Sequence, residues 1–305
     1  MKIRPPVAIP LALALAVALT VAFSLAPIPA CTRPAPHASV QVLPIDDIAG
    51  LSGLDHDPAG SLWAVPERQP LLLELPSAGP PRRVPLRGLP EGLELESLAF
   101  LSPGHFALGT EHGCSSGSER ILFARLESGE AHIHGGLDLP LSLWSAPCDP
   151  SHGIEGLCHA SGHLIAVLEQ TRTVAGQRRA LGARVPLPPA PFDPAPFELT
   201  LTSGTGRISA LACRPRADLI EVLAIERHFE VSRLITFSLP QTGPLPPDPL
   251  PATMALDISS LTGGGRRNFE GITWIDETHA ALLVDNHYRV VTGPNELAHI
   301  EVPAR

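Results

Sequence analysis

Two sets of polar residues recur at regular spacing along the chain, and together they have the oxygen chemistry of a cation site. The first set consists of Ser52, Glu96, Glu155, Ser209 and Glu270. An acid follows each member 14 to 17 residues later, and these closing acids are Glu67, Glu111, Glu169, Glu226 and Asp285. Because the first set offers only carboxylate and hydroxyl oxygens, it favours Ca²⁺ over zinc or copper.

Basic side chains accompany the closing acids and suit an anionic substrate. Those predicted to bind substrate are Arg227, His228, His287 and His112. Glu67 and Arg68 are the predicted catalytic pair, with the Glu67 carboxylate as base and the Arg68 guanidinium holding a phosphate in bidentate fashion. A second interpretation stays open, in which the acids only accept hydrogen bonds from neighbouring units and the bases form ion pairs between units.

The segments that carry these residues have the pattern of β-strands. In each of five repeats, short apolar runs are separated by turn residues such as Asp57-Pro58-Ala59-Gly60. No helical spacing of apolar residues recurs between them. All-β repeats of about fifty residues are typical of four-stranded propeller blades. The sequence therefore predicts an all-β, five-bladed β-propeller over residues 40–305, with six blades as the alternative.

A propeller would bring the two sets together at one end of its central channel. The first-set residue opens the innermost strand of each blade and the closing acid ends the next strand, so antiparallel pairing places them side by side. Several glutamates that face one channel repel each other unless a cation or protons relieve the repulsion. We further expect Val40–Ile45 to pair with the last blade and to close the ring.

The first thirty residues have the pattern of an export signal. Met1–Arg4 is basic, residues 7–26 are apolar and Ala26–Ala30 supplies small residues for cleavage, with a retained membrane anchor as the alternative. Cys31 follows a loose lipobox, so residues 31–39 are either a Pro-rich tether behind a lipidated cysteine or the start of a secreted chain. We expect a monomeric, extracytoplasmic bacterial protein that meets a membrane only through Cys31.

Composition excludes several classes of function. Lys2 is the only lysine and lies in the predicted signal, which excludes a Schiff base, a Walker-type phosphate loop and a Ser–Lys dyad. The formal net charge of −9 argues against a nucleic-acid partner.

The cysteines after Cys31 fall into two kinds of sequence. Cys114 and Cys148 lie in loop sequence and are a predicted disulfide, whereas Cys158 and Cys213 lie in apolar runs and are predicted to be buried thiols.

At these repeats the sequence resembles the esterase-like-activity-of-phytase family, a phytase-like propeller domain of exported bacterial proteins. The motifs that carry the resemblance are Leu51-Ser-Gly-Leu54, Leu95-Glu-Ser-Leu-Ala99, Gly153-Ile-Glu-Gly-Leu157, Ile208-Ser-Ala-Leu211 and Asn268-Phe-Glu-Gly-Ile272. The Ser/Glu/Glu/Ser/Glu order of the first set is also similar to that of calcium-activated apyrases, which are five-bladed propellers with calcium at the axis. The first resemblance implies phosphoester hydrolysis, and the second supports calcium at the first set.

The combined expectation is a calcium-dependent hydrolase of phosphate esters that acts on a small anionic ester. Two other classes of function remain as alternatives. One is a non-catalytic envelope protein stabilised by calcium, and the other is a lactonase or carboxylesterase, which rests on fold-level analogy.

Overall fold

The computed structural model describes residues 38–45, 47–111, 117–247, 249–263, 267–285 and 293–303. The chain divides into two units, Met1–Pro34 and Ala35–Arg305, and all described residues belong to the second. The predicted signal and most of the predicted tether, including Cys31, therefore lie outside the described residues. Within the described ranges, no helix is long and apolar enough to cross a membrane.

The first half of the described chain forms one eight-stranded sheet made of two antiparallel runs of four strands. The first run contains β2 (Leu51–His56), β3 (Leu62–Pro66), β4 (Leu71–Leu75) and β5 (Arg82–Arg87). The second contains β6 (Glu94–Ser102), β7 (His105–Glu111), β8 (Ser118–Glu127) and β9 (Glu130–Pro140). The outermost strands of the two runs, β5 and β9, pair in parallel over two residues and so join the runs.

Three further sheets follow. The next contains β10 (Gly156–Ala160), β11 (His163–Val174), β12 (Gln177–Pro186), β13 (Ala195–Thr200) and the short β17 (Leu250–Pro251). The sheet after it contains β14 (Arg207–Arg216), β15 (Leu219–His228), β16 (Val231–Pro240) and β18 (Thr253–Asp257). The last contains β19 (Asn268–Trp274), β20 (His279–Asp285), β21 (Glu296–Glu301) and β1 (Ala38–Val42). In the described part of the chain, two 3-10 helices, η2 (Leu141–Trp144) and η3 (Ser259–Thr262), occur between strands.

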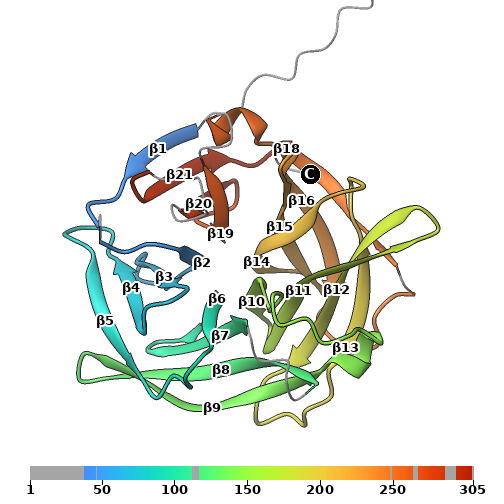
Figure 1. The fold of residues 1–305 in the computed structure, drawn as a ribbon, viewed down its shortest axis with the longest axis horizontal. Helices are drawn as coiled ribbons and strands as arrows, with labels where there is room; N and C mark the ends of the chain where they lie inside the picture. Colours follow the sequence, from blue (N-terminus) through green and yellow to red (C-terminus); the bar gives the residue numbers. More distant parts are fainter. Residues whose placement is uncertain are drawn as a thin grey trace, which may run out of the picture. The chain divides into compact units, whose positions relative to one another are not determined.

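The predicted closure of the ring by the N-terminal strand is confirmed. Strand β1 pairs antiparallel with β21, with Val40 opposite Ala298, and so completes the last sheet. The strands β2, β6, β10, β14 and β19 lie nearest a central axis (Figure 1). Each of them contacts the next, and β19 contacts β2. The described residues therefore form an all-β, propeller-type fold.

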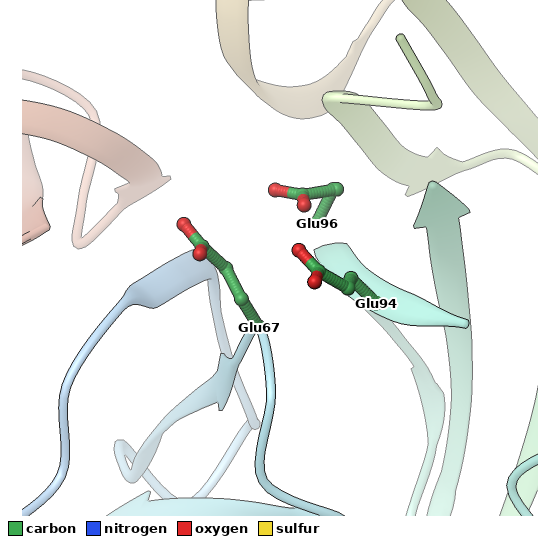
Figure 2. A group of neighbouring side chains, drawn as sticks. All are labelled: Glu67, Glu94 and Glu96. Atoms are coloured by element: carbon green, nitrogen blue, oxygen red, sulfur yellow. The ribbon is translucent and has the colours of Figure 1, made fainter. Parts of the chain in front are cut away.

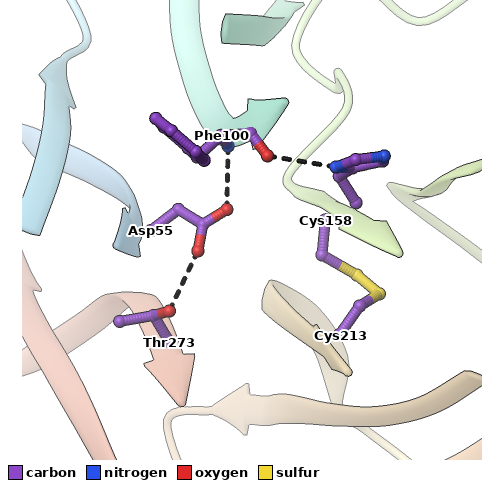
Figure 3. The surroundings of a disulfide bond; sticks show 6 residues. Asp55, Phe100, Cys158, Cys213 and Thr273 are labelled. Carbon is purple, nitrogen blue, oxygen red and sulfur yellow. Dashed lines mark hydrogen bonds between the residues drawn. A yellow bond between two sulfur atoms is a disulfide. The ribbon is translucent and has the colours of Figure 1, made fainter. Parts of the chain in front are cut away.

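Apolar side chains fill the space between neighbouring strand runs. One cluster packs Trp63 and Phe106 between the two runs of the eight-stranded sheet. Another packs Phe197 and Phe237 between the sheet of β10–β13 and the sheet of β14–β16. Hydrogen bonds also link the innermost strands β2, β6 and β19. One carboxylate oxygen of Asp55 accepts a hydrogen bond from the Phe100 amide (2.8 Å), and the other accepts one from the Thr273 hydroxyl (3.0 Å; Figure 3).

A disulfide joins two of the innermost strands, and the prediction of buried thiols at these positions is wrong. Cys158 on β10 and Cys213 on β14 are bonded, with their Cα atoms 5.4 Å apart (Figure 3). Each cysteine lies in an apolar run, but the two strands are neighbours around the axis, which the pattern of a single strand does not reveal. Cys148 is also disulfide-bonded. Its predicted partner, Cys114, lies outside the described residues.

Candidate functional site at one end of the ring

Bulges in four of the five innermost strands lie at or next to a residue predicted to bind a cation. The pairing with the second strand shifts register between Ser52 and Leu54, and again across Glu96, Ser209 and Glu270. A bulge turns a side chain away from its regular direction and is frequent beside active sites. In β2 the extra residue is Gly53 (φ 56°), where a Cβ atom would lie 2.6 Å from the Leu98 nitrogen of β6. Only glycine allows that approach.

Five glutamates gather at the end of the ring where the innermost strands begin. Oxygen atoms of Glu67, Glu94 and Glu96 lie within 4.8 Å of one another, and the three side chains point toward a common space (Figure 2). Oxygen atoms of Glu96, Glu111 and Glu155 also lie within 4.8 Å of one another, so Glu96 belongs to both groups of three. Glu96 and Glu155 are buried. We call Glu67, Glu94, Glu96, Glu111 and Glu155 the acidic cluster.

Mutual repulsion and burial raise proton affinity within the acidic cluster. Burial, followed by the charge of Glu155, raises the pKa of Glu96 well above its usual range, and Glu111 adds a hydrogen bond between carboxyls. Burial, followed by the charge of Glu169, likewise raises the pKa of Glu155. Burial and then the Asp285 carboxylate raise the pKa of Glu67 to about 7, against the effect of Arg68. A cation bound among these oxygens would relieve the same repulsion.

Glu270 does not lie in the acidic cluster, although it was predicted to bind the cation with Glu96 and Glu155. Its carboxylate forms a two-contact ion pair with Arg227, whose Nε lies 3.0 Å from Oε2, and accepts a hydrogen bond from Asn268 (2.8 Å). Arg227 lies opposite Arg207 on paired strands, and both guanidiniums act to lower the pKa of Glu155. The end of the ring therefore has an acidic side and an arginine side.

Arg207, Glu94 and Asn268 are site residues that the sequence reasoning missed. Arg207 forms an ion pair with Glu169, Glu94 belongs to the acidic cluster, and Asn268 donates to both Glu270 and Asp285. Each lies two residues before a first-set member in its strand. Because this position recurs in three of the repeats, its constant spacing from the first set could have been recognised as a further ring of site residues.

The two serines of the first set contact the backbone of the next strand. Ser52 donates its hydroxyl to the Glu96 carbonyl (2.5 Å) and Ser209 donates to the Phe269 carbonyl (3.0 Å). Both side chains are buried. These bonds tie β2 to β6 and β14 to β19, so the serines help to place the neighbouring glutamates.

Glu67, the predicted base, belongs to the acidic cluster, whereas Arg68 is held in an ion pair with Glu94. Its Nε lies 3.1 Å from Glu94, and its side chain is 65 % exposed. The contact joins the strand run of β2–β5 to that of β6–β9, which agrees with the ion-pair interpretation for this arginine. The Glu67 carboxylate instead faces Glu94 and Glu96 (Figure 2).

The remaining predicted residues have different surroundings. Glu226 is fully buried and accepts four hydrogen bonds from Thr202 and Ser203, so it holds a loop in place. His228 is partly buried, and its Nδ1 has no hydrogen-bond partner among the described residues. His112 and His287 lie outside the described residues.

Comparison with known proteins identifies the family. The model of the phytase-like family, described as esterase-like activity of phytase, matches residues 46–288, and the chain belongs to this family. No curated protein matches the sequence.

A solved structure with a TM-score above 0.5 supports the propeller-type fold. A thermostable family-43 glycoside hydrolase is similar at 10% identity and a TM-score of 0.53, over 86% of this chain and 92% of the other. The PQQ-bound aldose sugar dehydrogenase of Streptomyces coelicolor is similar at 13% identity and a TM-score of 0.47, over 89% of this chain and all of the other. At such identities the likeness concerns the fold alone.

Proposed function

We propose that this chain is a five-bladed, calcium-binding propeller that hydrolyses phosphate esters at the acidic end of its ring. The five blades are the two runs of the eight-stranded sheet and the three sheets that follow. Their innermost strands contact one another in a closed cycle, which supports this count. The observation that carries the proposed activity is that one end of the ring holds both the acidic cluster, in which Glu96 and Glu155 are buried, and the facing arginines Arg207 and Arg227.

The acidic cluster fits a hard cation. It offers oxygen ligands alone, and its carboxylates are partly removed from water and repel each other, so Glu96, Glu111 and Glu155, with Glu67 and Glu94 at the edge, would hold Ca²⁺. When bound, the ion would supply positive charge to a phosphoryl oxygen.

Side chains on one side of the site would bind the substrate, and a side chain on the other side would accept a proton. Arg227 and Arg207 would bind the anionic group of the ester, because a planar guanidinium matches a phosphate with two parallel hydrogen bonds. In this structure they pair with Glu270 and Glu169, so the substrate would replace part of those ion pairs. Glu67 would accept a proton from the attacking water at one of its carboxylate oxygens. A bound cation would lower the pKa of Glu67 from its cation-free value of about 7, so its carboxylate would be ionised and able to act as a base near neutral pH.

Turnover of a substrate panel tests this function. Phosphate monoesters, nucleotides, phytate, carboxylic esters and lactones are assayed with Ca²⁺ and with EDTA. We expect hydrolysis of phosphate esters that EDTA abolishes, and a loss of about 100-fold or more in kcat for Glu67→Gln. Glu277→Gln, at a side chain 74 % exposed and far from the acidic cluster in the fold, is the matched control and should retain full turnover.

Other outcomes of the same panel point to other functions. Calcium-dependent turnover of lactones or carboxylic esters alone would replace phosphate esters as the substrate class. No turnover of any substrate would leave a non-catalytic calcium-binding propeller and would refute the hydrolase.

We further propose that the mature protein is an exported monomer, either lipid-anchored through Cys31 or secreted. This rests on the sequence pattern of residues 1–39.

A further inference from the structure

Two cavities of equal volume, about 450 Å³ each, lie between neighbouring sheets. The first lies between the β14–β18 sheet and the last sheet, and Arg214, Arg216, Glu221 and Glu277 line it. These four side chains form ion pairs with one another. The second lies between the last sheet and the β2–β5 run, and we call it the closure cavity because β1 borders it.

The closure cavity differs from the first in charge. Among the described residues that line it there is no Asp, Glu, Lys or Arg. Its apolar wall includes Leu43, Leu62, Leu75 and Leu297, which are all buried. The segment Pro76–Pro81 forms another part of the wall, and its prolines restrict the backbone before any ligand arrives. A volume of this size is in the range of small-molecule sites.

The polar groups of the closure cavity are few. His299 is half-buried, and its side chain makes no hydrogen bond or ion pair with any described residue. Burial lowers the pKa of His299, so its imidazole is neutral at physiological pH. The nearby His56 already bonds the Thr273 hydroxyl through Nδ1 (3.0 Å). The imidazole of His299 therefore has its hydrogen-bonding capacity available to a ligand.

We propose that the closure cavity binds an uncharged, mostly apolar small molecule whose polar group hydrogen-bonds to the imidazole of His299. The leucines supply the apolar surface. The described lining residues include no Asp, Glu, Lys or Arg, and His56 is already paired with Asp55, so an ionic ligand would lose its hydration without gaining a free counter-charge. This site lies apart from the acidic cluster, since its lining residues include the hairpin turn at Gly60 between β2 and β3, at the end of β2 opposite Ser52.

A pair of rim residues provides matched variants. Ile275 lines the closure cavity and is 40 % exposed, whereas Leu219 lines the charged cavity and is 39 % exposed. Glutamate at either position places one new charge at the rim of a cavity of the same volume. Both side chains are exposed enough for the variants to fold, which a thermal melt verifies.

Titration with Nile red, an uncharged apolar fluorophore, at pH 8 tests the proposal on the full-length protein. We expect saturable binding at one site per chain. Ile275→Glu should weaken binding at least tenfold, His299→Phe about fivefold through the lost hydrogen bond, and Leu219→Glu less than twofold. Non-saturable binding would overturn the proposal. So would an unchanged affinity in Ile275→Glu, or an equal loss in Leu219→Glu.

Discussion

Replacing Cys158 and Cys213 together with alanine is expected to lower the free energy of unfolding by about 4 kcal/mol. The disulfide joins residues 55 positions apart, and so it removes many conformations from the unfolded chain. It also links the innermost strands β10 and β14, on which Glu155 and Arg207 depend for their positions. Urea denaturation of the wild type and the variant, followed by circular dichroism, measures the difference.

The single variants separate the cross-link from the packing of the two sulfurs. Either Cys158→Ala or Cys213→Ala breaks the bond, so each alone should cost nearly the full amount and the double variant little more. Two small costs of about 1 kcal/mol each that simply add would show that packing, rather than the cross-link, accounts for the loss.

The second large effect is expected in the pH dependence of stability without a cation. The pKa of Glu67 is about 7 in the folded protein and 4.5 for an unperturbed glutamate, so the folded state binds this proton more tightly than the unfolded state. The penalty for ionising Glu67 is therefore absent below pH 4.5 and complete above pH 7. It reaches about 3 kcal/mol, and the raised pKa values of Glu96 and Glu155 act in the same direction.

Melting curves in EDTA between pH 5 and pH 8 measure this effect. Wild type should melt at progressively lower temperature as the pH rises, by about 6 °C from Glu67 alone. Folding also raises the pKa of His56 and lowers that of His299, so the informative quantity is the difference from Glu67→Gln, which should lose less stability across the range. Parallel curves for the two proteins would contradict the raised pKa of Glu67.

Much of the fold was predictable because spacing along a strand is a local property. The intervals between first-set residues and closing acids predicted paired strands, and β2–β3, β6–β7 and β19–β20 pair accordingly. The apolar run at residues 40–45 predicted closure by the N-terminal strand, which β1 provides at residues 38–42.

The partners of individual side chains were not predictable in the same way. Cys158 meets Cys213, and Glu270 meets Arg227, across strands that are far apart in sequence. Such contacts depend on the order and tilt of the innermost strands around the axis, which no single repeat encodes. Glu94 and Arg207 were accessible in principle, since each lies two residues before a first-set residue.

Calorimetric titration of Ca²⁺ into the full-length protein, combined with melting curves, tests the cation site at the acidic cluster most directly. We predict one Ca²⁺ per chain, and a rise in melting temperature of about 5–10 °C at a Ca²⁺ concentration near 100 times Kd. Glu155→Gln should lose both the heat of binding and the rise, while Glu277→Gln should keep both. A wild type that neither binds Ca²⁺ nor gains stability at millimolar Ca²⁺, or a Glu155→Gln variant that responds like the wild type, would contradict this site.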